Sequence, residues 1–386
     1  MAGWVDADQG AGGTTKFAVL EKPRLRVAVL PNHEFGLKNR LFAEDFVSNT
    51  QWMAANLEWR RFFHKNGIEL LTHDLLPIDQ ADVVICIDLP EKRSRVAEIR
   101  QLTAGKKLIL YLLESPFKKP YFFLPENHSE FDKVVTYNPY LCTSDRYKRF
   151  YVSVDLRKQV PLEQSGYSQR KIVAMVNTNY YTGIRSYPRP WNIVGYYRKL
   201  WRDGWQFGFN DILKSERCLQ YMERQRVARA AERFPQGILD IYGAGWAGRK
   251  SGWFYRFFPD RPYRDALGPF QGSNLEVMAK YRFVVAFENY ASDEGYISEK
   301  FFDPILAGAV PIYCGDKNIL NLVDGKCFVD ARQFKNHIEL LEFARDCPEV
   351  EWETMRQAGR DFLNSTRAEV FRPKNFANVM LEAVLE

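Results

Sequence analysis

Residues 281–315, YRFVVAFENYASDEGYISEKFFDPILAGAVPIYCG, contain two clusters of polar side chains that could bind an anion. One cluster directly follows an apolar run and the other directly precedes the next apolar segment; together they comprise Glu288, Asn289, Ser298, Glu299 and Lys300. Lys300 is the most informative of them, because a cation in the first turn of a helix opposes the helix dipole. Its position makes most sense if an anion such as a phosphate binds at that turn. The segment therefore predicts a site for a diphosphate.

A β-loop-α-β unit would bring these side chains together. The apolar run 282–287 predicts a buried strand, and 310–313 predicts a second one. Between them lies an apolar helix that Gly308 closes. In open parallel sheets, ligands bind outside the carboxyl ends of the strands. Both polar clusters should meet at that edge. Pro304 interrupts the helix, where it would remove a hydrogen bond.

The combined pattern FEN, polar loop, SEK, apolar helix, AG and VPIYCG resembles the donor-binding motif of the α-1,3-fucosyltransferases, glycosyltransferase family 10. Weaker matches follow the expected order elsewhere: Glu114-Ser115-Pro116, Val176-Asn177, and Arg226 before the predicted strand 238–242. The resemblance spans roughly residues 105–335 and departs from the family at Pro304 and in the long stretch between Asn177 and Arg226. It implies an inverting transfer of L-fucose from GDP-fucose to a glycan hydroxyl, in an α-1,3-type linkage.

Glu114 is the candidate for the general base that such a transfer needs. A single displacement requires a carboxylate to take the proton of the attacking hydroxyl. Glu114 follows the apolar run 107–113, and Pro116 discourages the strand from continuing, so the side chain could point into a cleft. The alternative is a residue that only caps a strand at the surface. The leaving diphosphate needs positive charge, a role that the resemblance gives to Lys300 and Arg226.

The resemblance assigns donor binding to several further residues. Ser298 and Glu299 should contact the nucleotide sugar, since carboxylate oxygens suit pairs of ribose or fucose hydroxyls. Asn289 and the backbone near Val284 would lie on the same wall. Glu288 either contacts the ligand or braces Lys300, and both readings stay open.

Two more donor contacts come from other segments. Asn177 ends its predicted strand and would meet the donor from the neighbouring loop. Tyr151, in DRYKRFY, resembles a donor-contacting tyrosine, with packing in the core as the alternative. The aromatic and basic segment 180–221 could serve an acceptor, an oligomer contact or simply a subdomain core.

Alternating strand and helix patterns predict an α/β fold, and the resemblance implies GT-B, two Rossmann-like domains that face each other across a cleft. We expect a flexible tail at 1–22, an acceptor-side domain at 23–163 that carries Glu114, and a GDP-sugar-binding domain at 164–386 that includes the terminal helices. Expected strands are 25–30, 81–87, 107–113, 133–137, 171–176, 238–242, 282–287, 310–313 and 327–329; expected helices include 50–65, 335–346, 350–364 and 374–385.

The composition of the chain limits the kinds of partner that it could bind. Lys and Arg exceed Asp and Glu only by 54 to 48, a net charge of +6, which makes general nucleic-acid binding a poor interpretation. No apolar run approaches the length of a membrane helix. We therefore expect a cytoplasmic chain and leave peripheral membrane contact open. Six scattered cysteines fit reduced packing residues, and the five histidines show no zinc-binding spacing, so neither a metal nor another cofactor is expected besides the donor.

Three hypotheses follow. The first is the fucosyltransferase, the second a related transferase that uses another nucleotide sugar, and the third a non-catalytic glycan-binding or assembly protein of the same fold. The GxGxxG spacing at 243–248 adds little to them, because the residues that follow lack the helix that a dinucleotide fingerprint requires.

Overall fold

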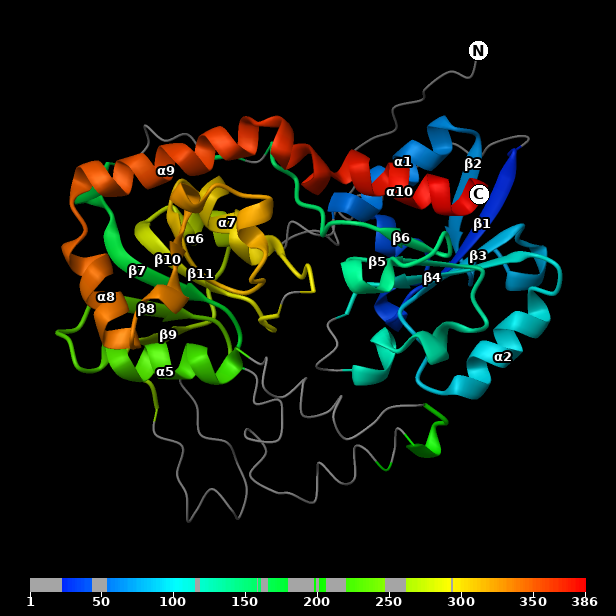
Figure 1. Ribbon diagram of the computed structural model, residues 1–386, viewed down its shortest axis with the longest axis horizontal. Helices are drawn as coiled ribbons and strands as arrows, with labels where there is room; N and C mark the ends of the chain where they lie inside the picture. Colours follow the sequence, from blue (N-terminus) through cyan, green and yellow to red (C-terminus); the bar gives the residue numbers. More distant parts are fainter. Residues whose placement is uncertain are drawn as a thin grey trace.

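The computed structural model describes residues 23–43, 54–114, 119–157, 159–160, 166–179, 198, 201–205, 220–246, 262–292 and 294–386. It has two lobes, each built on a parallel six-stranded sheet (Figure 1). The first sheet has the order β2-β1-β3-β4-β5-β6, with bounds β1 Leu25–Leu30, β2 Ile68–Thr72, β3 Val83–Ile87, β4 Lys107–Leu112, β5 Lys133–Thr136 and β6 Tyr147–Arg149. The second has the order β12-β11-β10-β7-β8-β9, with bounds β7 Lys171–Val176, β8 Leu239–Tyr242, β9 Ala266–Gly268, β10 Tyr281–Phe287, β11 Val310–Cys314 and β12 Val329–Asp330.

Helices cover both faces of each sheet, as a parallel sheet requires. In the first lobe, α1 and α10 pack on one face and α2 on the other. In the second lobe, α6, α7 and α9 share a core with Val284 and Ala286, whereas α5 and α8 pack against Phe283 and Val285. Alternate residues of β10 thus face opposite layers. The helices span α1 Ala54–Lys65, α2 Arg93–Leu102, α5 Tyr221–Ala231, α6 Asn274–Met278, α7 Glu299–Leu306, α8 His337–Asp346, α9 Glu349–Asn364 and α10 Pro373–Leu385.

The predicted strands are present, with shifts of one to a few residues at their ends. The largest shift concerns 327–329, since β12 is Val329–Asp330. Three strands escaped prediction, namely β2, β6 and β9, and each lies at an edge of its sheet. β6 and β9 have only three residues each, and only alternate residues of β2 are buried, so these strands lack the continuous apolar run of a central parallel strand. Pro304 lies inside α7, which continues to Leu306.

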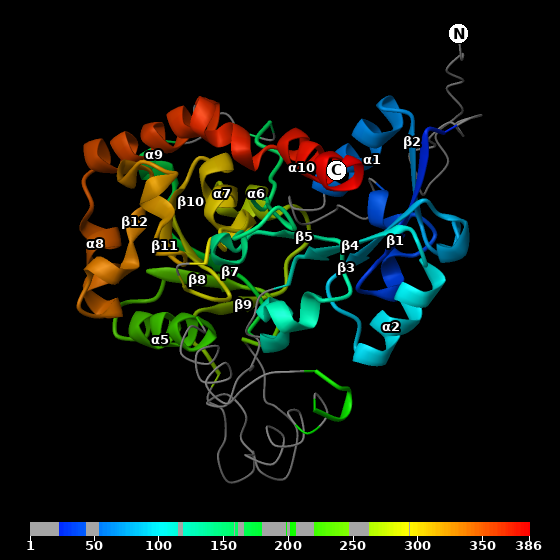
Figure 2. The same cartoon turned by 45° about the vertical axis from the view of Figure 1, so that its right-hand side comes forward.

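The structure differs from the predicted second domain, 164–386, at its last helix. Helix α10 returns to the first lobe and lies beside α1 (Figure 2). Phe376 packs edge-on against Trp59, with ring centroids 5.8 Å apart, in the core of that lobe. An amphipathic helix needs an apolar surface to cover, and its own sequence does not specify which sheet supplies it.

Two of the crossings of the chain between the lobes lie side by side. Val152 belongs to the core of the first lobe and Val154 to that of the second, so the first crossing comes before the predicted boundary at 163. The Val154 N–H donates to the Phe371 carbonyl oxygen at 2.9 Å, which joins the outgoing and returning segments. The predicted tail 1–22, residues 161–165 and most of 180–221 lie outside the described residues.

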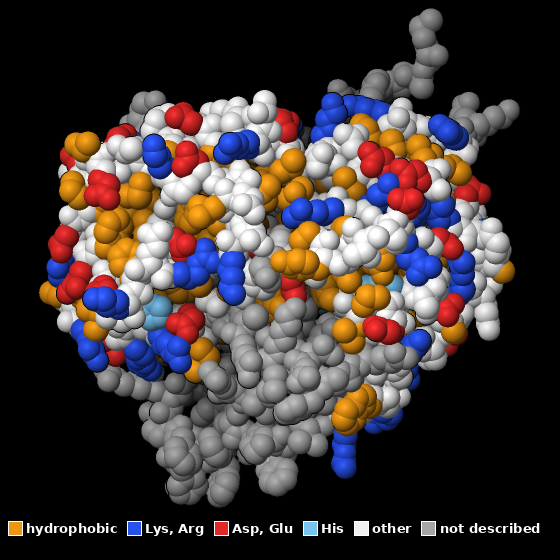
Figure 3. Space-filling model, viewed as in Figure 1, with side chains coloured by type: hydrophobic (Ala, Val, Ile, Leu, Met, Phe, Trp, Pro, Cys, Tyr) orange, Lys and Arg blue, Asp and Glu red, His pale blue; other side chains and the backbone are white. Residues whose placement is uncertain are grey.

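Charged side chains of both signs are interspersed over the two lobes on the face shown in Figure 3. Among the described residues, no helix combines the length and the apolar character that a membrane span needs. The five cysteines that the structure describes are free thiols, as the sequence predicts for reduced packing residues.

Candidate active site

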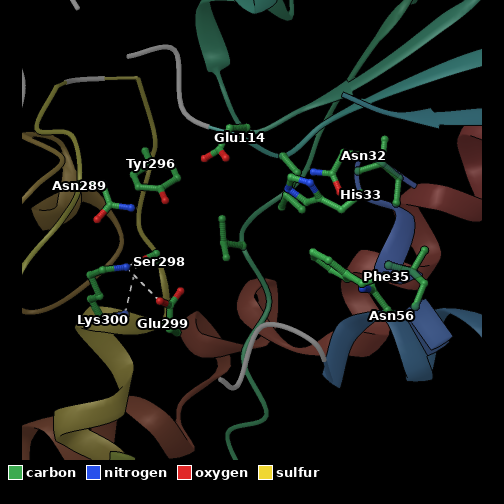
Figure 4. Close-up of a pocket in the computed structure, with 14 residues that line it drawn as sticks. Asn32, His33, Phe35, Asn56, Glu114, Asn289, Tyr296, Ser298, Glu299 and Lys300 are labelled. Atoms are coloured by element: carbon green, nitrogen blue, oxygen red, sulfur yellow. Dashed lines mark hydrogen bonds and ion pairs between the residues drawn. The ribbon is translucent and has the colours of Figure 1, made fainter. Parts of the chain in front are cut away.

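A cavity of about 320 Å³ lies between the lobes, beyond the carboxyl ends of strands of both sheets (Figure 4). The second lobe contributes Asn289, Tyr296, Ser298, Glu299 and Lys300. The first lobe contributes Asn32, His33, Phe35, Leu41, Asn56, Ile87, Leu113, Glu114 and Val152. Five of the sequence-predicted site residues therefore line one cavity, although they are far apart in the sequence and belong to different lobes: Glu114, Asn289, Ser298, Glu299 and Lys300.

Ser298 begins α7 and is fixed by Glu288. The Ser298 backbone is extended, and its hydroxyl oxygen accepts the Lys300 N–H at 3.3 Å as a helix N-cap. Glu288 directly follows β10, accepts the Ser298 N–H at 2.7 Å, and pairs with the Ser298 hydroxyl at 2.6 Å. Burial raises the pKa of Glu288 to about 7, although the Lys300 charge opposes this shift. Glu288 is fully buried and does not line the cavity, so its contacts fit the bracing role.

Lys300 and Glu299 form an ion pair on the cavity wall, with Nζ and Oε1 3.0 Å apart. Burial alone would lower the pKa of Lys300, but the carboxylates of Glu299 and Glu288 raise it overall. Burial disfavours the charge of Glu299 as well, yet the Lys300 ammonium and its hydrogen bond lower that pKa. Both side chains therefore carry charge in the cavity, with the ammonium at the N-terminus of α7.

Arg224, two residues before the predicted Arg226, is the arginine beside this wall. Its buried guanidinium donates to the Phe287 carbonyl oxygen and, at 3.0 Å, to Asn289 Oδ1. Arg226 points elsewhere: its side chain is 59% exposed and paired with Glu223, and it lines a separate hollow.

The sequence did contain a signal for Arg224. Two positions along an α-helix rotate a side chain by about 200°. Arg224 shares a helical stripe with the buried Val227, Ala228 and Ala231, which marks the side of α5 that faces the sheet.

Three further predicted donor contacts, besides Glu288 and Arg226, do not line the cavity. The Tyr151 ring lies under the Arg149 guanidinium at 4.6 Å and 5.4 Å from the Phe371 ring, which fits the packing alternative. Val284 is buried inside β10. Asn177 directly follows β7 and has a buried Oδ1 with no hydrogen-bond partner among the described residues.

The approach of Asn177 to the end of β8 requires Gly243. A Cβ at Gly243 would clash with the Asn177 carbonyl oxygen, and the φ of Gly243, +122°, is one that other residues rarely adopt. The first glycine of the GxGxxG spacing therefore has a packing reason. Its last residues, 247–248, and the basic pair that follows lie outside the described residues.

Glu114 lies just past the end of β4. In Figure 4 it lies between the cavity residues of the first lobe and those of the second. Its carbonyl oxygen accepts the Tyr137 hydroxyl at 3.4 Å. It also lines a second cavity of about 530 Å³, formed entirely by the first lobe. The two cavities share Asn32, His33, Ile87 and Glu114. Glu114 is thus at their junction.

Aromatic residues that the sequence analysis did not single out shape the first cavity. The His33 and Phe35 rings stack with centroids 4.9 Å apart, and Phe35 is 54% exposed. Tyr296, from the loop before α7, is half-buried with its ring 5.3 Å from that of Tyr137, so this loop of the second lobe contacts the first. The sequence signal for His33 and Phe35 was their position directly after β1.

Among the described residues, no group of three His, Cys, Asp or Glu side chains is arranged to hold a metal ion.

Solved structures share this architecture. An α-1,3-fucosyltransferase crystal structure superposes with a TM-score of 0.54 over 97% of this chain and 93% of that one, at 14% identity. An α-glucosyltransferase in complex with UDP superposes with a TM-score of 0.50 over 92% and 100%, at 11% identity. Such likeness concerns the fold alone. Two parallel six-stranded sheets that face a shared cavity define a GT-B glycosyltransferase fold, as expected from the sequence.

Sequence comparison finds similarity to known proteins in the second lobe. Residues 240–349 match the family model described as glycosyltransferase family 10 (fucosyltransferase) C-term. The GDP-fucose protein O-fucosyltransferase 3 of Rattus norvegicus is 39% identical over 70 residues, 18% of this chain and 14% of that protein. The α-(1,3)-fucosyltransferase FucT of Helicobacter pylori is 30% identical over 82 residues, 21% and 17%. The alignments thus span less than a fifth of these relatives. This segment of the chain therefore matches glycosyltransferase family 10, the family that the sequence motifs resemble.

Proposed function

We propose that this chain transfers L-fucose from GDP-fucose to a hydroxyl of a glycan, with inversion and in an α-1,3-type linkage. One observation carries the proposal: a cation at a helix N-terminus and a carboxylate line one cavity from opposite lobes, Lys300 from the second and Glu114 from the first. A cation suits the leaving diphosphate, and a carboxylate suits the attacking hydroxyl. The family match and the named fucosyltransferase relatives support the donor.

The donor belongs on the wall of the second lobe. Its diphosphate would lie against Lys300 and the first turn of α7, where the helix dipole also favours an anion. Glu299 and Ser298 border the same space and offer oxygens to sugar hydroxyls. Arg224 takes over the role predicted for Arg226, because its charge lies behind Asn289 rather than at the outer surface.

The reaction is a single displacement. The acceptor oxygen attacks the anomeric carbon of fucose while the bond from that carbon to the diphosphate oxygen breaks. The electron pair of that bond stays on GDP, and the acceptor proton passes to Glu114. Attack opposite the leaving group inverts the anomeric carbon. We propose that Lys300 and Arg224 supply the positive charge that stabilises the leaving diphosphate, without a metal or other cofactor.

The acceptor belongs on the side of the first lobe. The second cavity meets the first at Glu114, so a sugar there could present a hydroxyl to this carboxylate. The stacked His33 and Phe35 rings offer an apolar surface beside it, and aromatic faces with polar neighbours suit pyranose rings. The cytoplasmic location expected from the sequence stays a prediction.

The variant Glu114→Gln tests the proposal. It keeps the shape of the side chain and removes the base, so we expect transfer to fall by about 10²- to 10⁴-fold while GDP-fucose affinity stays within about twofold. Transfer is followed as GDP release and labelled product with a panel of glycans. A variant that transfers at the wild-type rate would contradict the role of Glu114.

A further inference from the structure

Asp88, at the end of β3, has an unusual backbone conformation and a carboxylate that accepts three hydrogen bonds. Its φ is +61°, the left-handed region that non-glycine residues rarely adopt but that Asp and Asn tolerate best. The residue is only 4% exposed. It lies directly after β3 and lines the second cavity, at the edge of the first sheet where Glu114 lies.

The Asp88 carboxylate holds the turn that carries Glu114. Oδ1 accepts the N–H of Leu113 at 2.8 Å and that of Glu114 at 3.0 Å. The register of β4 with β5 ends at Leu112, so both N–H groups lie beyond that ladder. Oδ2 accepts Asn32 Nδ2 at 2.9 Å. One carboxylate therefore joins the carboxyl ends of three adjacent strands, in the order β1, β3, β4.

We propose that Asp88 is a positioning residue, which fixes Glu114 where it can accept the acceptor proton; this inference rests on the proposed function. A base works only within hydrogen-bonding reach of the proton that it takes. Without the carboxylate, the N–H groups of Leu113 and Glu114 would turn to water in the cavity. A displacement of about 1 Å at a reacting group can cost about 10²-fold in rate.

The alternative is a carboxylate that merely stabilises the first lobe. The two readings predict different effects on donor binding and on kcat. A positioning residue acts on the chemical step, and the proposed donor wall lies on the other lobe. Loss of Asp88 should therefore lower kcat and leave GDP affinity unchanged, whereas a general loss of structure would change the unfolding midpoint and the binding stoichiometry.

Two substitutions separate the carboxylate from the backbone conformation. Asp88→Gly accepts a φ of +61° without strain and lacks the carboxylate. We expect its kcat to fall about 10²-fold, with GDP affinity by isothermal titration within about twofold of wild type. Asp88→Asn keeps one acceptor oxygen for the two N–H groups and loses the bond to Asn32, so we expect a kcat about fivefold lower. If the glycine variant does not fold, the asparagine variant decides.

A double-mutant cycle tests whether Asp88 acts through Glu114. In a Glu114→Gln background, Asp88→Gly should cause little further loss, because the group that it positions is already inactive. An equal further loss would overturn the proposal, as would a wild-type kcat in folded Asp88→Gly or, if that variant does not fold, in Asp88→Asn. If Glu114→Gln itself transfers at the wild-type rate, the proposed role of Glu114 as the base fails first and this inference fails with it. If kcat falls as expected in Glu114→Gln but stays at the wild-type value in Asp88→Gly, this inference is refuted and the proposed function is not.

Discussion

Lys300→Ala should weaken GDP binding and slow transfer even more. The ammonium lies on the cavity wall, 3.0 Å from Glu299 Oε1. Two unit charges about 4 Å apart attract by about 4 kcal/mol at an effective dielectric constant of about 20. Glu299 already offsets part of the ammonium charge, so we expect GDP binding to lose about 2 kcal/mol, or about 30-fold in Kd.

The rate should fall further because negative charge builds on the diphosphate as the glycosidic bond breaks. An electrostatic contact of this kind contributes about 3 to 4 kcal/mol to the transition state, so kcat/KM should drop by about 10²- to 10³-fold. Lys300→Arg should recover part of the affinity but less of the rate, since a guanidinium places its charge differently from a compact ammonium.

Isothermal titration with GDP and initial rates measure both effects. Lys317→Ala is the matched control, because it removes the same charge from an exposed position of the same lobe outside the cavity. Its GDP affinity and rate should match wild type. If Lys300→Ala behaves like Lys317→Ala, no anion binds at the start of α7, and the reasoning that assigns the diphosphate to this turn is refuted.

Other outcomes follow from the contacts of the second lobe and of the last helix. Arg224→Ala should weaken GDP binding by about tenfold or more, since it removes a buried charge hydrogen-bonded to Asn289, whereas the exposed Arg226→Ala should change affinity less than about twofold by the same titration. Burial raises the pKa of Glu288 from its ordinary value of 4.5 to about 7, so its protonation contributes stability that is complete below about pH 4.5 and lost as the pH rises through about 7. Urea unfolding should therefore show that the free energy of unfolding of Glu288→Gln falls less over this range than that of wild type, by up to about 3 kcal/mol; parallel pH profiles would be inconsistent with a raised pKa. Phe376→Ala should destabilise the chain by about 3 to 5 kcal/mol, because the side chain is buried against Trp59, while Leu385→Ala, on the exposed end of α10, should cost less than about 1 kcal/mol.

The cavity wall of the second lobe, to which we assign the donor, could be predicted from the sequence because its signals are local. Ser298 caps the helix that it precedes, Lys300 lies in the first turn, and the apolar run before Glu288 is the central strand β10. Each of these features depends on residues within a few positions of one another. The fold class follows in the same way, since buried parallel strands are continuous apolar runs.

The remaining features depend on packing between distant segments. Whether Arg224 or Arg226 faces the sheet is set by the rotation of α5, which a two-residue shift inverts. The side of the molecule that α10 covers depends on which sheet leaves an apolar face open. The bond from Asp88 to the Glu114 N–H joins residues 26 positions apart through the order of the strands, and neither residue signals the other in sequence.

Isothermal titration of the wild-type chain with GDP-fucose and, separately, with UDP-glucose tests the central claim most directly. If the cavity at Lys300 is a GDP-fucose site, GDP-fucose should bind with a stoichiometry of one, and UDP-glucose should bind about 10²-fold more weakly or not at all. Tighter binding of UDP-glucose would contradict the account and favour a transferase of the same fold for another nucleotide sugar. Binding of neither donor would favour a non-catalytic protein.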